Sequence, residues 1–296
     1  MHLKIGYFAD GPWSHLAFEK LISDKDITIK FICVRYDTQD QTLYKYCQQY
    51  NIDYLKHKDI NSKEFVQHIR LYECDLFISM SFNQIFKKEI INLPKLKTIN
   101  CHAGKLPFYR GRNILNWALI NDEKEFGITV HYIDEGVDTG DIILQRLFPI
   151  TEKDNYATLL KIAYIECANI LYDAVILFKK QQVQRIKQTT IHPTGFYCSQ
   201  RKAGDEILDW NQTSREIFNF VRAICEPGPM ARSFIDKHEI KINKVELIPN
   251  APDYKNIIGA VIGIDKNTLI VKTKDSFIKI IEYSSSKKIK IGDRFE

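Results

Sequence analysis

The sequence predicts an α/β protein: a Rossmann-like, mostly parallel sheet with helices on both faces, then a smaller, mainly-β, barrel-like C-terminal domain. In the first 150 residues, short apolar runs alternate with longer mixed segments, which is the pattern of strand–helix–strand units. Beyond about residue 250, three apolar runs follow one another across short turns. A chain of 296 residues with 45% hydrophobic content can bury one large core and a small one. We therefore expect domains over residues 1–190 and 191–296.

In the N-terminal domain, the short apolar runs predict strands and the mixed segments between them predict helices. The predicted strands are residues 3–8, 27–34, 75–80, 96–100, 127–133 and 142–150. The predicted helices are residues 13–22, 41–50, 62–71 and 155–180, and residues 114–119 are also helix-like. The polar segment 181–192 lacks either period and is expected to be a linker.

The C-terminal domain is expected to begin with a helix over residues 214–224, which Pro227-Gly228-Pro229 ends. Strands are predicted at residues 257–264, 268–273 and 277–283. They form a small antiparallel sheet or barrel in this interpretation. An exposed face of such a sheet is either an edge to be covered or a surface for a second copy, so the sequence leaves open whether the protein is a homodimer.

The most distinctive segment is T-I-N-C-H-A-G-K-L-P-F-Y-R-G, from Thr98 to Gly111, and the loop G-V-D-T-G-D follows further along the chain. Asn100 and His102 share one face of the predicted strand end, because successive strand side chains alternate. In open α/β sheets the working site lies beyond the carboxyl ends of the strands. If the loop brings Asp138 to the imidazole, the three side chains form an acyl-transfer site with an oxyanion donor, a proton acceptor and an orienting anion.

These two segments, together with residues 127–131, 208–210 and 217–223, resemble the folate-dependent N-formyltransferases. That family includes methionyl-tRNA formyltransferase and the amino-sugar formyltransferases, and the resemblance runs in order along nearly the whole chain. It implies that Asn100 meets the oxyanion, that His102 takes the proton of the attacking amine and that Asp138 orients the imidazole. It also makes the N-terminal domain the catalytic one. This chain has Ala103-Gly104 where many members carry Pro-Ser or a similar pair.

The resemblance further implies 10-formyltetrahydrofolate as co-substrate, with no metal. The residues expected to bind it flank the catalytic three: Gln84, Ile85, Phe86, Arg112, Asp134, Glu135, Gly136 and Val137. Their residue types leave an alternative open, in which Ile85 and Phe86 are core residues and Asp134 is an ordinary turn residue.

For the acceptor, residues 111–117, 195–197 and 201–205 resemble the amino-sugar branch of the family. This favours a UDP- or dTDP-linked amino-deoxy sugar for bacterial surface glycans, including pseudaminic-acid-type precursors. Arginine suits phosphate contacts and aromatic rings suit base stacking. The candidate substrate-binding residues are Gly11, Pro12, Trp13, Arg110 and Arg201. Initiator methionyl-tRNA is the alternative substrate, and it needs a broad cationic surface to neutralise many phosphates.

The distribution of charge bears on whether the protein binds nucleic acid. The net charge is +5, and residues 237–296 alone hold twelve Lys or Arg against eight Asp or Glu, a net of +4. This basic part either touches nucleic acid or is a solvated face. A non-enzymatic RNA-binding protein is the remote alternative, and it leaves Asn100, His102 and Asp138 unexplained.

Three further classes are disfavoured by motif and spacing. The first predicted strand is followed by D-G-P-W, which is no dinucleotide-binding fingerprint. A metal hydrolase using His102, His131, Asp134 and Asp138 lacks preorganised ligand spacing. The seven cysteines are spread without a C-x-x-C pair, which favours reduced thiols. With no long apolar run and no signal-like N-terminus, we expect a cytoplasmic protein with no membrane partner.

Overall fold

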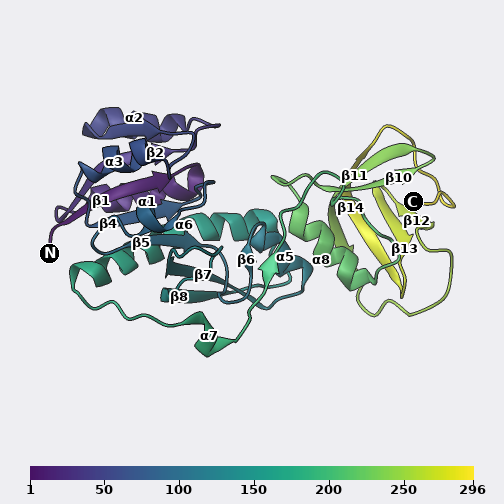
Figure 1. Ribbon diagram of the computed structural model, residues 1–296. Helices are drawn as coiled ribbons and strands as arrows, with labels where there is room; N and C mark the ends of the chain where they lie inside the picture. The colour runs from purple at the N-terminus through teal and green to yellow at the C-terminus, as the bar shows by residue number, and fades with distance from the viewer. The chain divides into compact units, whose positions relative to one another are not determined.

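The computed structural model describes residues 1–296, which divide into two compact units (Figure 1). The N-terminal unit comprises residues 1–111, 126–148 and 161–198. The C-terminal unit comprises residues 112–125, 149–160 and 199–296. The chain therefore enters the C-terminal unit twice before it stays there, and the single domain boundary after residue 190 stays a prediction.

A seven-stranded sheet forms the centre of the N-terminal unit, in the order β3-β2-β1-β4-β5-β7-β8 (Figure 1). Pairing from β3 through β5 is parallel, and β7 pairs with β5 in the antiparallel sense. The strands are β1 (Leu3–Ala9), β2 (Ile27–Val34), β3 (Asp53–Lys56), β4 (Leu76–Met80), β5 (Thr98–His102), β7 (Glu125–Tyr132) and β8 (Ile142–Pro149). The mostly parallel sheet predicted from the sequence is confirmed.

The connecting helices are α1 (Pro12–Ile22), α2 (Gln41–Tyr50), α3 (Lys63–Arg70), α4 (Lys88–Ile91), α6 (Tyr156–Lys179) and α7 (Gln188–Ile191). Two short strands, β6 (Arg110–Gly111) and β9 (Tyr197–Cys198), pair in parallel. Helix starts follow local chemistry: the Asp40 carboxylate caps α2 and the Ser62 hydroxyl caps α3. No helix is both long and apolar enough to cross a membrane.

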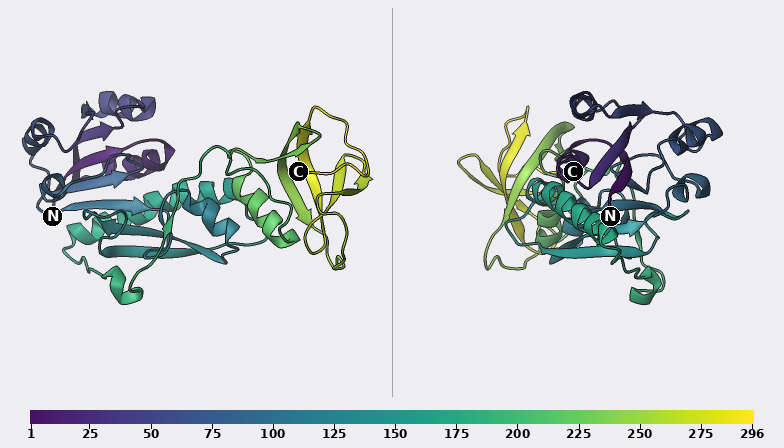
Figure 2. Two further views of the ribbon diagram at one scale, coloured as in Figure 1. Left: turned by 45° about the vertical axis from the view of Figure 1, so that its right-hand side comes forward. Right: turned by 90° about the vertical axis from the view of Figure 1, so that its left-hand side faces the viewer.

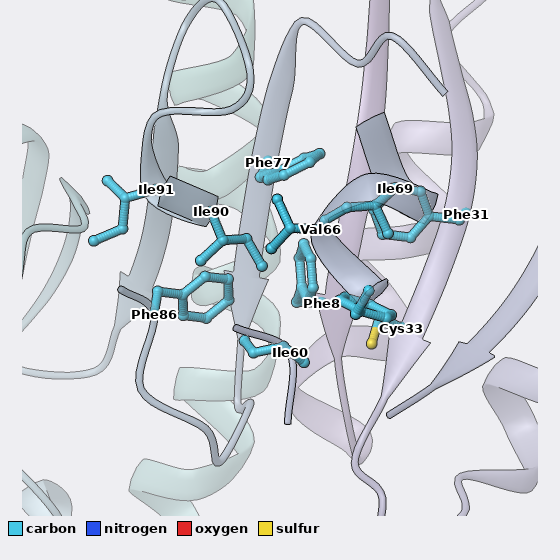
Figure 3. Packing of buried hydrophobic residues seen from close by; sticks show 11 residues of the cluster. Phe8, Phe31, Cys33, Ile60, Val66, Ile69, Phe77, Phe86, Ile90 and Ile91 are labelled. Carbon is cyan, nitrogen blue, oxygen red and sulfur yellow. The ribbon is translucent and has the colours of Figure 1, made fainter. Parts of the chain in front are cut away.

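An aromatic cluster joins one face of the sheet to α3 and α4 (Figure 3). The ring of Phe8 lies 5.5 Å from Phe31, 5.3 Å from Phe77 and 5.0 Å from Phe86, centre to centre. Gly6 makes this packing possible, because a Cβ there would lie 2.5 Å from the Phe31 ring. The cluster packs against β1, β2 and β4, and β5 lies next to β4 in the sheet.

The C-terminal unit holds α5 (Ile114–Ile120), α8 (Ser214–Ile224) and a five-stranded antiparallel sheet, and Figure 2 shows α8 beside that sheet. Its strands are β10 (Ala231–Ile235), β11 (His238–Leu247), β12 (Val261–Asp265), β13 (Thr268–Lys272) and β14 (Phe277–Ser285), in the order β10-β11-β14-β13-β12. Thr213 and Glu216 form a capping box at the start of α8. The mainly-β C-terminal domain is confirmed.

Candidate functional site

Strand β5 places the first two predicted catalytic side chains at the carboxyl end of the sheet. Its register against β7 sets Asn100 opposite His131 and His102 opposite Thr129. Asn100 and His102 share a face of β5, as the alternation of strand side chains predicts. Cys101, between them, contacts the Cys167 carbonyl oxygen of α6 through its Sγ at 3.6 Å. The strand therefore separates the polar pair from the core side of the sheet.

The imidazole of His102 is buried between two oxygen acceptors. Its Nε2 lies 2.8 Å from the Tyr109 carbonyl oxygen, and its Nδ1 lies 3.7 Å from Oδ2 of Asp138. A carbonyl oxygen only accepts hydrogen bonds, so Nε2 carries a proton and donates it to Tyr109. In the neutral ring the lone pair is then on Nδ1, the nitrogen that faces Asp138.

The absence of a side chain at Gly104 leaves space for the His102 ring. A Cβ at this position would lie 2.4 Å from His102 Nε2 and 2.5 Å from the Tyr109 carbonyl oxygen. The Thr129 hydroxyl donates a hydrogen bond of 2.7 Å to the Gly104 carbonyl oxygen and fixes the turn. Glycine in the Ala103-Gly104 pair is therefore required by the packing around the imidazole.

Asp138 reaches His102 from the loop between β7 and β8. Its Oδ2 accepts a 2.9 Å hydrogen bond from the Gly111 N–H, and its Oδ1 lies 3.5 Å from His131 Nε2. Burial alone would raise the pKa of the Asp138 carboxyl, but the two nearby imidazoles and the Gly111 N–H lower that pKa well below its ordinary value. Asp138 is therefore ionised at neutral pH and presents an anion to both rings.

His131 is a site residue that the sequence suggested only as a metal ligand. Its side chain is almost fully buried, its Nδ1 donates to the Tyr132 carbonyl oxygen at 2.8 Å, and its Nε2 lies 3.2 Å from Asn100 Nδ2. The ring thus accepts one N–H of the Asn100 amide and leaves the second to donate elsewhere. His131 lies opposite Asn100 because β7 pairs with β5 in the antiparallel sense, which the sequence pattern does not indicate. No group of three or more His, Cys, Asp or Glu side chains has an arrangement that could hold a metal ion.

The segment expected to be a linker also contributes a buried residue. Ile186 pairs with Ile142, and Gln188 at the start of α7 is 3% exposed. The Gln188 side-chain amide donates to the carbonyl oxygens of Asp138 and Gly140, both at 2.8 Å. No pattern distinguishes Gln188 from its exposed neighbours in the sequence, because only the tertiary fold brings it to the Asp138 loop.

The residues expected to bind folate after β4 fall into different environments. The Gln84 side chain bridges a neighbouring loop, since its Oε1 accepts from Ile60 N and its Nε2 donates to the His57 carbonyl oxygen. Ile85 is 61% exposed, whereas Phe86 is 4% exposed and belongs to the aromatic cluster. The alternative that Phe86 is a core residue is thereby supported, and an exposed Ile85 is compatible with ligand contact.

The loop expected to contact folate before Asp138 is exposed and internally braced. Asp134 accepts hydrogen bonds from the Gly136 N–H and from the Thr139 hydroxyl, and Val137 is 46% exposed. Glu135 and Gly136 are also exposed. Arg112 is exposed too, but it belongs to the C-terminal unit, so its predicted role in this site stays a prediction.

Three of the expected substrate-binding residues begin α1. Gly11 has a φ of 68°, and its N–H donates to Oδ2 of Asp40 at 2.7 Å. Pro12 is exposed at the first turn of the helix. Trp13 is half-buried and packs edge-on against Tyr164 with ring centres 4.7 Å apart. The ring of Trp13 is thus held by α6.

The two expected substrate-binding arginines are engaged within the protein. Arg110 is 7% exposed and donates to Gln188 Oε1 and to the Thr194 carbonyl oxygen. Arg201 lies in the C-terminal unit, over the Phe220 ring, with its Nη1 buried and without a hydrogen-bond partner. Burial lowers the pKa of the Arg201 guanidinium. Their roles in substrate binding stay predictions.

Comparisons with known proteins agree with the resemblance read from the sequence. The family described as formyl transferase matches residues 21–175, and its C-terminal domain matches residues 201–295. The methionyl-tRNA formyltransferase of Halothermothrix orenii is 33% identical over 291 residues, covering 94% of this chain and 91% of its own length.

Two solved structures share the fold over nearly the whole chain. WlaRD, a sugar 3N-formyl transferase crystallised in the presence of dTDP and 5-N-formyl-THF, superposes with a TM-score of 0.69 at 23% identity and covers 98% of this chain and 100% of its own. An N-formyltransferase from Helicobacter canadensis, in complex with folinic acid and dTDP-3-aminofucose, gives a TM-score of 0.65 at 22% identity, with 96% and 100% covered. The family matches and the 33% identity over nearly the full length show that this chain belongs to the formyltransferase family and is an enzyme of formyl transfer.

Proposed function

We propose that this enzyme moves the formyl group of 10-formyltetrahydrofolate to the amine of a UDP- or dTDP-linked amino-deoxy sugar. The observation that carries the chemistry is the grouping of Asn100, His102 and an ionised Asp138 at the carboxyl end of β5. We also expect the enzyme to be cytoplasmic. Its oligomeric state is expected to be either a monomer or a homodimer.

His102 acts as the general base in this proposal. With Nε2–H donated to Tyr109, the free lone pair is on Nδ1. Nδ1 takes the proton from the amine nitrogen as that nitrogen bonds to the formyl carbon. The same proton is then available to the folate nitrogen as its bond to the formyl carbon breaks. The imidazole is thus neutral before attack and positively charged in between.

Asp138 stabilises that positive charge. Its carboxylate lies 3.7 Å from Nδ1, and its own hydrogen bond to the Gly111 N–H fixes its position without neutralising it. An opposite charge at that distance attracts the imidazolium that forms while His102 holds the amine proton.

Asn100 meets the negative charge that develops on the formyl oxygen. One of its two N–H groups is directed to His131 Nε2 at 3.2 Å, which orients the amide and leaves the other N–H for the oxyanion. Removing a donor of this kind costs about 100- to 1000-fold in kcat in comparable acyl-transfer sites.

The donor set suits a reduced folate. The exposed Ile85 and Val137 offer apolar surface for a ring system, and the two structurally similar proteins were crystallised with 5-N-formyl-THF and with folinic acid.

The nucleotide-sugar acceptor rests on two lines of support. A sugar 3N-formyl transferase and an N-formyltransferase match this fold over 98% and 96% of this chain, in crystals that contain dTDP or dTDP-3-aminofucose. The net charge of +5 is modest for a protein that must neutralise many tRNA phosphates. Initiator methionyl-tRNA is the second candidate acceptor, because methionyl-tRNA formyltransferases are 30–35% identical in sequence.

The test is formyl transfer by the purified enzyme with 10-formyltetrahydrofolate as donor. The acceptor panel contains UDP- and dTDP-linked 3-amino and 4-amino sugars, with initiator methionyl-tRNA alongside, and the product is detected by mass spectrometry. We expect one sugar nucleotide to gain a formyl group and the His102→Ala variant to lose that activity. Turnover of the tRNA alone would reassign the acceptor, and failure to bind the folate would reject the proposal.

A further inference from the structure

We propose that Gln188 is a positioning residue that keeps the Asp138 carboxylate in place beside His102. This inference rests on the proposed formyl-transfer chemistry. The Gln188 amide hydrogen-bonds to main-chain carbonyl oxygens and takes no direct part in the proposed reaction. It acts through the main chain of the loop that carries Asp138.

The Gln188 amide spans the turn on which Asp138 sits. Its Nε2 donates one hydrogen bond of 2.8 Å to the Asp138 carbonyl oxygen and another of 2.8 Å to that of Gly140. Both hydrogens of the amide are thereby used, and the side chain is 3% exposed. Asp138 has a φ of 54°, in the left-handed region that non-glycine residues adopt infrequently, and the two hydrogen bonds from Gln188 support the turn there.

Arg110 fixes which way the Gln188 amide points. Its Nε and Nη2 lie 3.0 Å and 2.7 Å from Gln188 Oε1. A guanidinium only donates hydrogen bonds, so Oε1 must face Arg110 and Nε2 must face the two carbonyl oxygens. A third donor, Nη1, binds the Thr194 carbonyl oxygen at 3.1 Å.

The strand residue next to Arg110 completes the arrangement. The Gly111 N–H donates to the Asp138 carboxylate at 2.9 Å, so β6 holds the carboxylate directly and holds its backbone through Arg110 and Gln188. A Cβ on Gly111 would lie 2.4 Å from the Cys198 carbonyl oxygen, which keeps β6 close against β9. Gly111 therefore binds the Asp138 side chain, and Gln188, held by Arg110, binds its main chain.

The contact that Gln188 supports is the one between the Asp138 carboxylate and the His102 ring. The Asp138 carboxylate lies 3.7 Å from His102 Nδ1, beyond direct hydrogen bonding, so its effect is electrostatic and weakens as the turn relaxes. The groups facing the His102 ring are this carboxylate, the Tyr109 carbonyl oxygen and the His131 ring, whose centre is 6.4 Å away. Of these groups, the carboxylate belongs to the residue whose main chain Gln188 bonds directly.

The test compares Gln188→Leu and Gln188→Glu with a matched control, Gln184→Leu, at an exposed position of the same segment. Gln188→Glu keeps an acceptor for Arg110 but loses both donors to the loop, so it separates the loop contacts from the burial of side-chain volume. We expect each Gln188 variant to lower kcat about 10- to 100-fold with KM within about twofold, the range found when a residue that orients a metal ligand is lost. The control should match wild type.

Coupling to Asp138 separates positioning from a general structural role. In an Asp138→Asn background, Gln188→Leu should lower kcat less than about twofold further, because the carboxylate that it positions is already gone. Effects that multiply in full would overturn the proposal, and so would wild-type kcat in a folded Gln188→Leu. If both Gln188 variants fail to fold while Asp138→Asn folds, the residue is structural and the proposal falls.

A readout without substrate keeps this inference distinct from the proposed function. The His102 imidazole signals are followed by NMR at one fixed pH in the ligand-free protein and are assigned with His102→Gln. They should shift in Gln188→Leu in the same direction as in Asp138→Asn, because both changes weaken the field of the carboxylate at the ring. Unchanged signals would overturn the inference even if the enzyme formylates its sugar. Absence of any wild-type turnover would instead reject the proposed function and leave this comparison standing.

Discussion

Replacing Asp138 by asparagine removes one negative charge from the site and little else. An asparagine oxygen can still accept the Gly111 N–H, which now binds the carboxylate at 2.9 Å, so the loop keeps its side-chain anchor. What is lost is the attraction between the carboxylate and the imidazolium that forms while His102 holds the amine proton.

The distance between the two groups sets the magnitude. At 3.7 Å and an effective dielectric constant of about 20, two unit charges attract by about 4 kcal/mol. The side chains are 9% and 13% exposed, so water reduces this only in part, to about 3–4 kcal/mol. At about 1.4 kcal/mol per tenfold, kcat should fall about 100- to 1000-fold with KM nearly unchanged.

The assay is steady-state formyl transfer to the acceptor identified in the panel, measured from pH 5 to pH 9. Asp141→Asn, a second acid of the same loop, is the matched control and should retain wild-type kcat. A kcat within about threefold of wild type would refute the electrostatic role given to Asp138.

Three further outcomes follow from single contacts. Gly104→Ala should destabilise the protein by about 1–3 kcal/mol and lower kcat, because its Cβ would overlap His102 Nε2 at 2.4 Å; thermal unfolding and the transfer assay check both effects. Because the folded-state pKa of the Asp138 carboxyl is lowered, its ionised form stabilises the fold above its ordinary pKa of about 3.9 and this contribution is lost as pH falls. The advantage of wild type over Asp138→Asn in urea unfolding should therefore shrink between about pH 5 and pH 3, and an advantage that grows there would contradict the assignment. Lys272→Met should cost about 1–3 kcal/mol in urea unfolding, since the buried Nζ donates to the Thr273 and Asp275 carbonyl oxygens at 2.9 Å and 3.0 Å.

Local pattern was enough for much of this protein. The alternation of side chains in β5 predicted that Asn100 and His102 share a face, and helices α2 and α8 have the bounds expected from their periodicity. The loop that brings Asp138 to His102 was expected from the motif, and the structure joins these two residues at 3.7 Å. Short-range signals sufficed because each depends on neighbouring residues.

Other features depend on contacts between distant segments. Strands β10 and β11 were not predicted. Strand β10 has only five residues, and a bulge at Lys244 breaks the apolar alternation of β11, which pairing with β14 stabilises. Strand β3 and helix α4 are too short to show a period. Gln188 lies in a polar segment whose place is set by the pairing of Ile186 with Ile142. Arg110 had the chemistry of a phosphate ligand in the sequence, yet the fold buries it against Gln188.

The most direct test of the central claim is the ratio of kcat/KM for the best nucleotide-linked amino sugar to that for initiator methionyl-tRNA, with one enzyme preparation and one donor concentration. The account predicts a ratio of at least about 1000, with both activities absent in His102→Ala. A ratio below one would contradict it and identify the tRNA as the acceptor of this formyltransferase.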